Sequence, residues 1–428
     1  MWVQEGIVTP ETAAQIREQY DKKLASKRPL TIVLFGCLGT LLIGFGFILI
    51  FARNWDDLPK WVRIIIAFLP LVFAQLLSLW VLIKQGSSQA WREGAGGFLS
   101  LAVGGCIALI GQIYHMPVDW HNFYLSWALL ILPAVYFLHS TLSAGIFLFT
   151  ITMWAASSQL SGSNALVFWP LFALIVPYLK SKYDENKSSW SLNTLAWMTT
   201  LTLTISVGVC LEKNLPGLWM PIYASLFAVL YFVGVIWFSE SQILWQQAYR
   251  TAGALGMIVI LWIMSFNSMW KEIGFTYYRS GGKYDPFAGI FDYVILVLLV
   301  TTAVSLFQHY SKRNKKNHLV VLFGCVPILA LFGYLLGQFS ATVVVGLFLF
   351  NVYIFFLSVA IMLRGIEENR LSLLNAGLIT FALLLMSRFF DMEMSLAVRG
   401  ILFILIGSGL LGANFWLIRR KSKEAFLK

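Results

Sequence analysis

Long apolar segments, many of them about twenty residues in length, are the feature of this sequence that most limits how it can fold. The stretch from Gly96 to Ser140 shows the pattern clearly. Two apolar runs lie on either side of a short polar segment, residues 112–122, which contains two histidines, an aspartate and a tryptophan. A helix of about twenty apolar residues crosses the hydrocarbon layer of a bilayer. The stretch therefore predicts two membrane helices joined by a polar turn.

The composition of the whole chain also indicates a membrane protein. Of the 428 residues, 59% are hydrophobic and only 12% are charged, and the mean hydropathy is +0.76. Soluble domains carry about 25% charged residues. Only helices and closed barrels satisfy their backbone hydrogen bonds within lipid, and these runs lack the short alternating pattern of barrel strands. The sequence therefore predicts an all-α fold, a polytopic bundle of transmembrane helices.

We expect fourteen spans, preceded by a short cytoplasmic amphipathic helix within residues 1–30. Thr9 and Pro10 predict the start of that helix, because a hydroxyl cap and a proline at the first helical position favour it. That helix docks on the membrane surface or on the cytoplasmic loops, or it is solvated. The sixth span is short and the junction of the fourth and fifth is tight, so either is alternatively a re-entrant or half-buried helix. The expected spans are residues 31–51, 64–83, 96–113, 122–138, 141–159, 165–179, 192–211, 217–238, 251–270, 288–308, 319–337, 341–363, 371–390 and 396–418.

The net charge of +11 reflects orientation in the membrane rather than nucleic-acid binding. Most lysines and arginines lie in short loops on one side of the predicted spans, as cytoplasmic loops do. This bias predicts that both termini are cytoplasmic. We divide the chain into the helix of residues 1–30, an N-terminal membrane region over 31–160 and a C-terminal membrane region over 161–428. The four cysteines have no paired spacing and predict neither a disulfide framework nor a metal motif.

Ionisable and polar residues near a membrane are costly, so their positions are the best indication of function. In the predicted topology, the unusual ones collect on the outer side and predict a polar rim with a pathway beneath it. The candidate residues for a ligand or ion pathway are His115, Asp119, His121, Gln112, Arg53, Asp56, Asp57, Asp292, Arg388, Asp391 and Arg399.

The polar turn holds the sharpest group, His115, Asp119 and His121. A compact turn would bring two imidazoles and a carboxylate together, as a divalent-metal site needs. The same residues suit proton coupling. Alternatively, the group is structural and Asp119 orients a histidine or caps the following helix. Because Pro117 interrupts a regular helix between these residues, the sequence leaves all three readings open.

Arg388 follows an apolar run and precedes two phenylalanines. A guanidinium in that position favours a carboxylate partner, and Asp391, Glu393 or the pair Asp56 and Asp57 would supply one. An outer-surface ion pair that fixes helix ends is one interpretation. The other is an arginine that faces an anionic ligand, such as a phosphate or a carboxylate.

Three segments resemble a known family. The runs GQIYHMPVDWHNFYLSWALLILPAVYFLHS, WVQEGIVTPETAAQI and RNWDDLPKWVR are similar to the bacterial membrane-protein family called domain of unknown function 2157. The segment LNAGLITFALLLMSRFFDMEMSLAVRGILFILIGSGLLGANFWLIRRK resembles the region often fused to it, domain of unknown function 4401. The resemblance implies a multi-pass protein of the bacterial inner membrane, and it carries no assigned activity.

Two functions fit these observations. One is a secondary transporter or flippase-like permease whose pathway opens at the outer rim; the other is a non-transporting scaffold or sensor in an envelope complex. A membrane enzyme is less favoured, because no nucleotide loop, nucleophile elbow or His-Glu-x-x-His motif is present. We expect no cofactor and no nucleic acid. The expected partners are the lipid bilayer, other membrane proteins and an unidentified small-molecule or lipid ligand.

Overall fold

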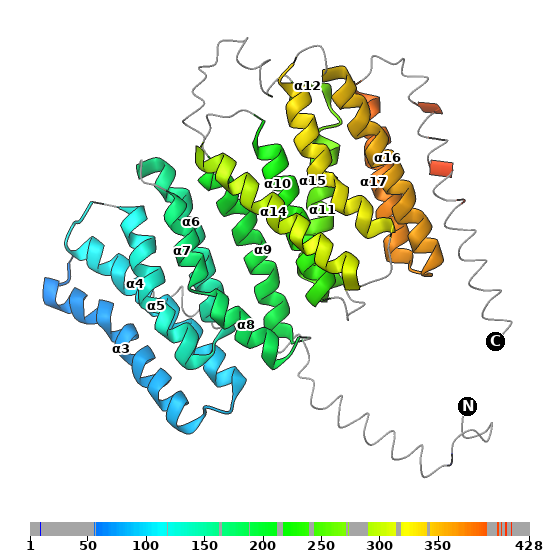
Figure 1. Ribbon diagram of the computed structural model, residues 1–428. Coiled ribbons are helices and arrows are strands. Elements are labelled where there is room, and N and C mark those ends of the chain that lie inside the picture. The colour runs from blue at the N-terminus through cyan, green and yellow to red at the C-terminus, as the bar shows by residue number, and fades with distance from the viewer. Residues whose placement is uncertain are drawn as a thin grey trace. The chain divides into compact units, whose positions relative to one another are not determined.

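A computed structural model describes most of the apolar part of the chain (Figure 1). In the residues that it describes, every regular element is helical, which confirms the all-α fold. Eleven of these helical segments are long and apolar enough to cross a membrane. The described residues are 9, 55, 57–117, 119–161, 165–187, 189–211, 217–238, 244–270, 273, 290–313, 318–339, 343–391, 400, 401, 404, 407, 408 and 412.

Ten long helices coincide with expected spans, although most of them extend a few residues further. Polar residues such as Lys60, Gln89 and Arg364 lie in these extensions, where a helix leaves the apolar layer. The helices are α3 (Lys60–Lys84), α4 (Gln89–Ile113), α5 (Trp120–Leu138), α6 (Thr141–Ser161), α9 (Trp190–Cys210), α10 (Trp219–Trp237), α14 (Ile290–Arg313), α15 (His318–Gly337), α16 (Val343–Glu367) and α17 (Leu371–Asp391).

Three expected elements lie largely outside the described residues. The N-terminal helix, apart from Thr9, and the span at 31–51 lie outside the described residues. Of the span at 396–418, only six separate residues are described. The total of fourteen spans therefore stays a prediction.

The sixth span consists of short pieces rather than one regular helix. It comprises η1 (Ala165–Val167), α7 (Phe168–Ala173) and α8 (Val176–Glu185), with a tight turn at Leu174 and Ile175. Pro177 causes the interruption, because it has no N–H to donate to the carbonyl of Ala173. Together the pieces cover 21 residues and remain long and apolar enough to cross a membrane.

The ninth span differs from the expected continuous helix over 251–270. It comprises η2 (Leu244–Gln247), the 16-residue α11 (Ala248–Ile263) and the single turn α12 (Asn267–Trp270). The helix ends before Ser265, whose hydroxyl donates to the Trp262 carbonyl at 2.6 Å. Such local bonds from a serine compete with the helical ladder. Hydropathy gives only a weak indication of this break, because the polar residues Ser265, Asn267 and Ser268 are interspersed with apolar ones.

The tight junction between α5 and α6 is a genuine helix-to-helix turn. His139 caps α5 in the left-handed conformation, with a φ of 50°, and α6 begins at Thr141. The two helices pack side by side. Both are long enough to cross a membrane, so neither is a half-length helix.

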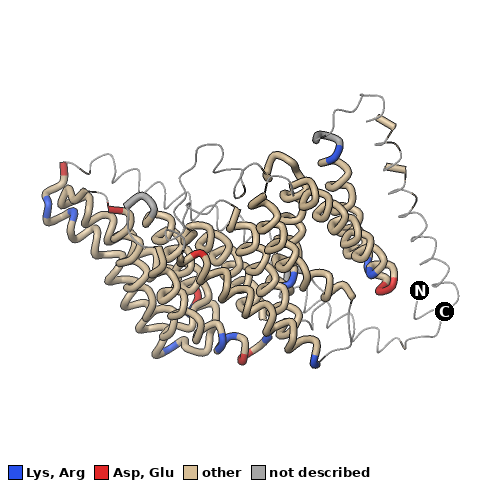
Figure 2. The backbone as a smooth tube through the Cα atoms, turned by 45° about the horizontal axis from the view of Figure 1, so that its top comes forward, with Lys and Arg blue, Asp and Glu red and all other residues tan. Residues whose placement is uncertain are grey.

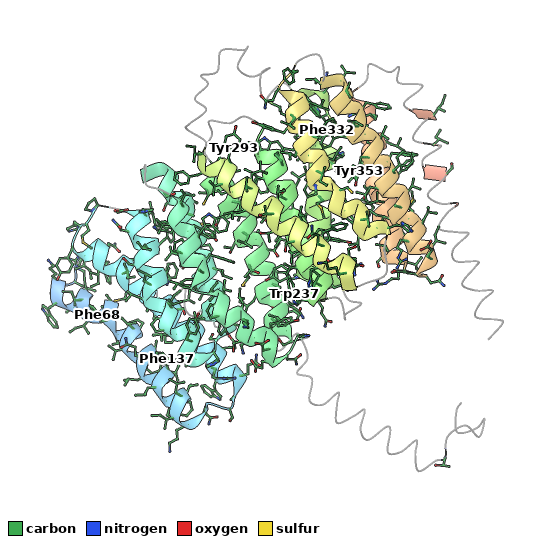
Figure 3. All side chains as sticks on the ribbon, in the orientation of Figure 1. Phe68, Phe137, Trp237, Tyr293, Phe332 and Tyr353 are labelled. Carbon is green, nitrogen blue, oxygen red and sulfur yellow. The ribbon has the colours of Figure 1, made fainter. Side chains whose placement is uncertain are left out.

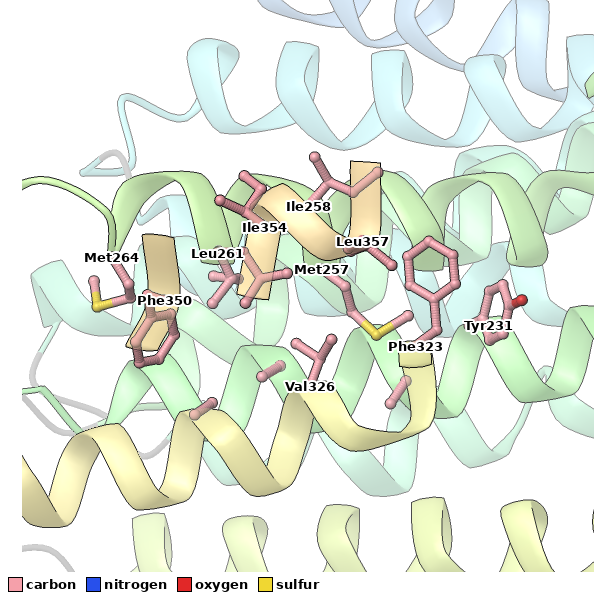
Figure 4. Packing of buried hydrophobic residues seen from close by; sticks show 14 of the residues in the cluster. Tyr231, Met257, Ile258, Leu261, Met264, Phe323, Val326, Phe350, Ile354 and Leu357 are labelled. Carbon is pink, nitrogen blue, oxygen red and sulfur yellow. The ribbon is translucent and has the colours of Figure 1, made fainter. Parts of the chain in front are cut away.

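The chain divides into two compact units, which we describe separately. The smaller unit contains residues 1–72 and 108–116, and its described core joins Trp55, Ala67 and Ile113. The larger unit contains residues 73–107 and 117–428. Its main core lies between α10, α11, α15 and α16 and includes Met257, Val326 and Phe350 (Figure 4).

Apolar side chains also cover the outward faces of the helices. Phe137, Phe332 and Trp237 project from the ribbon (Figure 3), with exposed fractions of 71%, 48% and 41%. Soluble proteins rarely expose so much contiguous apolar surface. Long central stretches of the helices carry no charge, and charged residues lie mainly toward helix ends (Figure 2). This surface indicates a lipid environment around the helices.

Consecutive helices of the larger unit run in opposite directions and so give it two ends. We call the end at which α5 and α16 finish the basic end, because nearly all described lysines and arginines of this unit lie there. They are Lys84, Arg92, Lys180, Lys182, Lys187, Arg250, Lys312, Arg313, Arg364 and Arg370. We call the opposite end the far end; among the described residues it holds Asp119, Asp292 and Arg388.

Candidate functional site

Asp119 at the far end caps α5. Its carboxylate accepts hydrogen bonds from the backbone N–H of Asn122 at 3.1 Å and from the Asn122 side chain at 2.5 Å. An acidic residue at a helix N-terminus satisfies a free N–H and complements the helix dipole. The hydrogen bond from the Asn122 backbone is the main reason that the pKa of Asp119 is lowered. The capping interpretation of Asp119 is therefore the one that the geometry supports.

His121 lies in the first turn of α5 and is half-buried against α6. Its ring lies 4.9 Å from the ring of Trp154, measured between centroids, and its Nδ1 lies 3.5 Å from the hydroxyl of Ser157. These contacts direct His121 toward the α5–α6 interface, whereas Asp119 is fully exposed.

His115, Gln112 and Asp57 belong to the smaller unit and are exposed. His115 follows the end of α4 and has a φ of 50°, a left-handed conformation that ends the helix. Within the described part of the chain, no three histidine, cysteine, aspartate or glutamate side chains are arranged to hold a metal ion. The candidates Arg53, Asp56 and Arg399 lie outside the described residues.

Arg388, near the end of α17, contacts the break that follows α11. Its Nη2 donates to the Ser265 carbonyl, and its guanidinium lies 5.9 Å from the centroid of the Phe266 ring. Asn351 of α16 donates to the same carbonyl at 3.3 Å. We call Ser265, Phe266, Asn351 and Arg388 the Arg388 site. It joins three segments that are distant in sequence, within the larger unit.

The physical basis of the Arg388 site is the end of a helix within an apolar region. The last carbonyls of a helix have no N–H partner within it and carry partial negative charge. Here the Ser265 carbonyl receives a guanidinium and an amide, and the Met264 carbonyl accepts from the Trp270 indole at 2.8 Å. The oxygen of the Asn351 side chain is buried and has no hydrogen-bond partner among the described residues.

The sequence predicts a carboxylate as a partner of Arg388, and this stays a prediction. The contact seen within the described residues is with the backbone carbonyl of Ser265. Glu393, Asp56 and the side chain of Asp391 lie outside the described residues. A sequence pattern cannot reveal the carbonyl, because every residue carries one and only the helix break makes this one available.

Asp292 is a buried acid in the first turn of α14, with an exposed fraction of 2%. It lies close enough to Cys210 of α9 to act on it electrostatically. Buried ionisable residues within membrane helices commonly mark functional sites.

Sequence reasoning missed the hydroxyl groups between α6 and α9. Thr152 and Thr202 are buried and their hydroxyls lie 3.3 Å apart, and the Thr199 hydroxyl lies 2.7 Å from that of Tyr249 on α11. The run TTLTLT at 199–204 is the sequence pattern that could have indicated these hydroxyl groups. Hydroxyl-rich interfaces allow close approach and hydrogen bonding between membrane helices.

Sequence reasoning also missed a polar cluster at the basic end. Glu93 of α4 accepts three hydrogen bonds at the start of α6: from the Ser140 hydroxyl at 3.0 Å and from the backbone N–H groups of Thr141 and Leu142 at 2.9 and 2.8 Å. Nearby on α8, Lys182 forms an ion pair with Glu185 at 2.9 Å. In the sequence, the basic residues here indicate the membrane topology. Their contacts depend on how α4, α6 and α8 pack together.

Comparison with known proteins gives a family match for the N-terminal part of the chain only. Residues 1–144 match the model of the family described as Predicted membrane protein (DUF2157). No curated protein and no solved structure matches the chain significantly. The resemblance to domain of unknown function 2157 is thereby confirmed, and that of the C-terminal part to domain 4401 stays a prediction. The chain is a polytopic α-helical membrane protein, and its first 144 residues match the family of predicted membrane proteins called DUF2157.

Proposed function

We propose that the protein is a secondary transporter or flippase-like permease of the bacterial inner membrane, with a polar pathway that opens at the far end of the larger unit. The observation that carries this proposal is the Arg388 site, where a guanidinium and an amide meet the carbonyl end of an interrupted helix. Interrupted helices whose ends face polar groups are typical of the substrate sites of secondary transporters.

Arg388 gives the proposed pathway its chemical preference. A guanidinium has several donors in one plane, a geometry that suits binding of a phosphate or a carboxylate. Phe266 supplies an apolar wall beside it. We infer an anionic substrate or an anionic headgroup as the ligand class.

Asp292 is the proposed ion-coupling residue. A carboxyl group with an exposed fraction of 2% near a helix N-terminus is suited to gain and lose a proton as its surroundings change. We propose that the rim around the pathway includes Asp119 and His121, the other candidates described in the larger unit at this end. The candidates Gln112, His115, Arg53, Asp56, Asp57, Asp391 and Arg399 stay predictions from the sequence.

The distribution of lysines and arginines supports one orientation of the protein in the membrane. Positive residues favour the cytoplasmic side, and those of the larger unit lie almost entirely at its basic end. We therefore propose that the basic end and both termini are cytoplasmic, and that the far end faces outward.

Cysteine accessibility tests the pathway without knowledge of the substrate. In a background with the four native cysteines replaced by alanine, we expect Asn351→Cys to react with a membrane-impermeant methanethiosulfonate added from outside, and also from inside as the pathway alternates. Ser225→Cys, a fully buried position on α10, is the control and should stay unlabelled. If Asn351→Cys reacts from neither side, the permease proposal is wrong.

Substitution of Arg388 separates a structural from a ligand-binding role. In Arg388→Ala the Ser265 carbonyl loses its charged donor, and such losses cost about 1.5–3 kcal/mol. If the role is only structural, folded yield in membranes falls and Arg388→Lys restores it. If Arg388 binds the ligand, Arg388→Lys still folds, but the extent to which Asn351→Cys is labelled from the inside changes. Arg364→Ala, at an exposed ion pair on α16, is the control and should have little effect.

A scaffold is the alternative, and close packing of the main core favours it. A Cβ added to Gly253 of α11 would lie 2.5 Å from the backbone of both Phe227 and Tyr231 on α10. Helices in such contact move together rather than apart. A scaffold predicts that neither Asn351→Cys nor Ser225→Cys is labelled from either side.

A further inference from the structure

His121 and Trp154 join the start of α5 to the later part of α6 within the larger unit. The centroids of their rings lie 4.9 Å apart, and the ring planes are inclined by 35°. Trp154 is 2% exposed, whereas His121 is only half-buried. The indole is therefore enclosed by protein, and solvent reaches the imidazole beside it.

Ser157 of α6 presents an acceptor to the same imidazole. Its hydroxyl donates to the Trp154 carbonyl at 2.8 Å, and a hydroxyl has a single hydrogen to donate. The Ser157 oxygen is therefore an acceptor toward the Nδ1 of His121, which lies 3.5 Å away. A neutral imidazole carries a hydrogen on one ring nitrogen, whereas an imidazolium carries one on each. Protonation of His121 therefore ensures that Nδ1 is a donor.

The indole of Trp154 also favours a positive charge on His121. Of the aromatic side chains, tryptophan attracts cations most strongly, at distances up to about 6 Å from the ring centroid. This attraction increases when the pair is shielded from water, and Trp154 is buried. A neutral imidazole in the same place contributes only packing.

The charged side chain next to this pair is Asp119. It lies two residues before His121, is fully exposed and interacts with His121 electrostatically. The segments α6, α7 and η1 contain no ionisable residue, and α8 carries its own toward the basic end. Within the described part of the chain, His121 belongs to no group that could hold a metal ion. The other ionisable residues on α5 and on its neighbours in the larger unit are Tyr124, Tyr136 and His139, then Arg92, Glu93 and Cys106 of α4, and Cys210 of α9.

We propose that His121, Trp154 and Ser157 form a pH-sensitive contact, in which protonation of His121 strengthens the attachment of the start of α5 to α6. Imidazoles titrate near pH 6.5. Below that pH, Nδ1 donates to Ser157 and the positive ring lies against Trp154; above it, the packing contact remains. The added stability is present in acid and is lost as the pH rises. The proposal applies to a transporter and to a scaffold alike, because it concerns only how α5 packs on α6.

Thermal unfolding of the full chain in detergent, at about pH 5.5 and about pH 7.5, tests the contact. On acidification, the melting temperature of the wild type should rise relative to that of His121→Gln by roughly 1–2 °C. His309→Gln is the matched control, because His309 is exposed on α14 and the substitution is the same. It should keep the full wild-type response. This pH range lies above that in which exposed carboxylates such as Asp119 titrate.

Two further variants test the partners of His121. Trp154→Phe keeps a ring that attracts cations less strongly, and Ser157→Ala removes the acceptor, so each should lose part of the response to acid. Combining Trp154→Phe with His121→Gln should change the response no further than His121→Gln alone. Folding of each variant is checked by size-exclusion chromatography. The proposal is overturned if folded His121→Gln responds to acid as the wild type does, or if Trp154→Phe and Ser157→Ala both keep the full response.

Discussion

At the scale of single residues, Asp119, Glu93 and Arg388 each form a hydrogen bond with a backbone group at a helix end. Asp119 satisfies an N–H at the start of α5, and Glu93 does so at the start of α6. Arg388 satisfies a carbonyl after α11. The sequence could identify Asp119 as a candidate cap, because its partners lie three residues away. It could not identify the bond from Arg388 to the Ser265 carbonyl, which lies 123 residues away and depends on a helix break.

The cap at Asp119 predicts a pH dependence. Because the folded-state pKa of Asp119 is lowered, its stabilisation is complete above the unfolded pKa and is lost as the pH falls through the folded pKa. Asp119→Asn keeps a good cap without a titrating group. Thermal unfolding in detergent should therefore be similar for wild type and Asp119→Asn at pH 7, and the wild type should lose stability relative to the variant below about pH 4.

Asp119→Ala removes the cap itself and should melt at a lower temperature than both proteins at pH 7. A wild type and an Asp119→Asn variant that respond identically to acid would show that the carboxylate contributes nothing.

At the scale of elements, apolar runs predict where helices cross but not where they are interrupted. The sequence marked the sixth span as unusual because it is short, and Pro177 explains its break. The break after α11 had a weaker signal, because the polar residues Ser265, Asn267 and Ser268 are interspersed with Met264, Phe266 and Met269. The tight α5–α6 junction is stable because α4 supplies Glu93 from outside the hairpin, a contact between helices that local patterns do not contain.

Glu93 is expected to hold the start of α6. Glu93→Ala leaves two backbone N–H groups and the Ser140 hydroxyl without their acceptor, and we expect a loss of about 2 kcal/mol, seen as a lower melting temperature in detergent. Glu93→Gln keeps one acceptor oxygen and should lose less. Glu367→Ala removes an exposed surface pair and should change little. Equal melting temperatures for Glu93→Ala and Glu367→Ala would contradict this role.

The close contact of α10 and α11 is expected to require Gly253. A Cβ there would meet the backbone of Phe227 and Tyr231, which a change of rotamer cannot relieve. Gly253→Ala should therefore cost about 1–3 kcal/mol and lower the folded yield measured by size-exclusion chromatography. Gly105→Ala on α4 is the matched control, because no neighbouring atom lies within 4 Å of its added Cβ. A Gly253→Ala yield equal to that of Gly105→Ala would show that the contact adjusts freely.

At the scale of the whole molecule, the apolar runs were enough to predict an all-α membrane protein, because a segment such as α15 has no stable alternative outside lipid. They were not enough to predict the candidate sites. The Arg388 site combines residues from three separate segments. Such sites depend on which helices become neighbours, and apolar helix faces in lipid specify their neighbours only weakly.

The orientation of one three-span segment tests the central claim that these helices cross the membrane. Between Asn122 and Lys187 the chain passes through α5, α6 and the interrupted α7–α8 segment. In the cysteine-free background, a membrane-impermeant thiol reagent added to intact cells should label Asn122→Cys, and should label Lys187→Cys only after the membrane is permeabilised. Labelling of both positions in intact cells, or of neither, would place them on the same side and contradict three crossings.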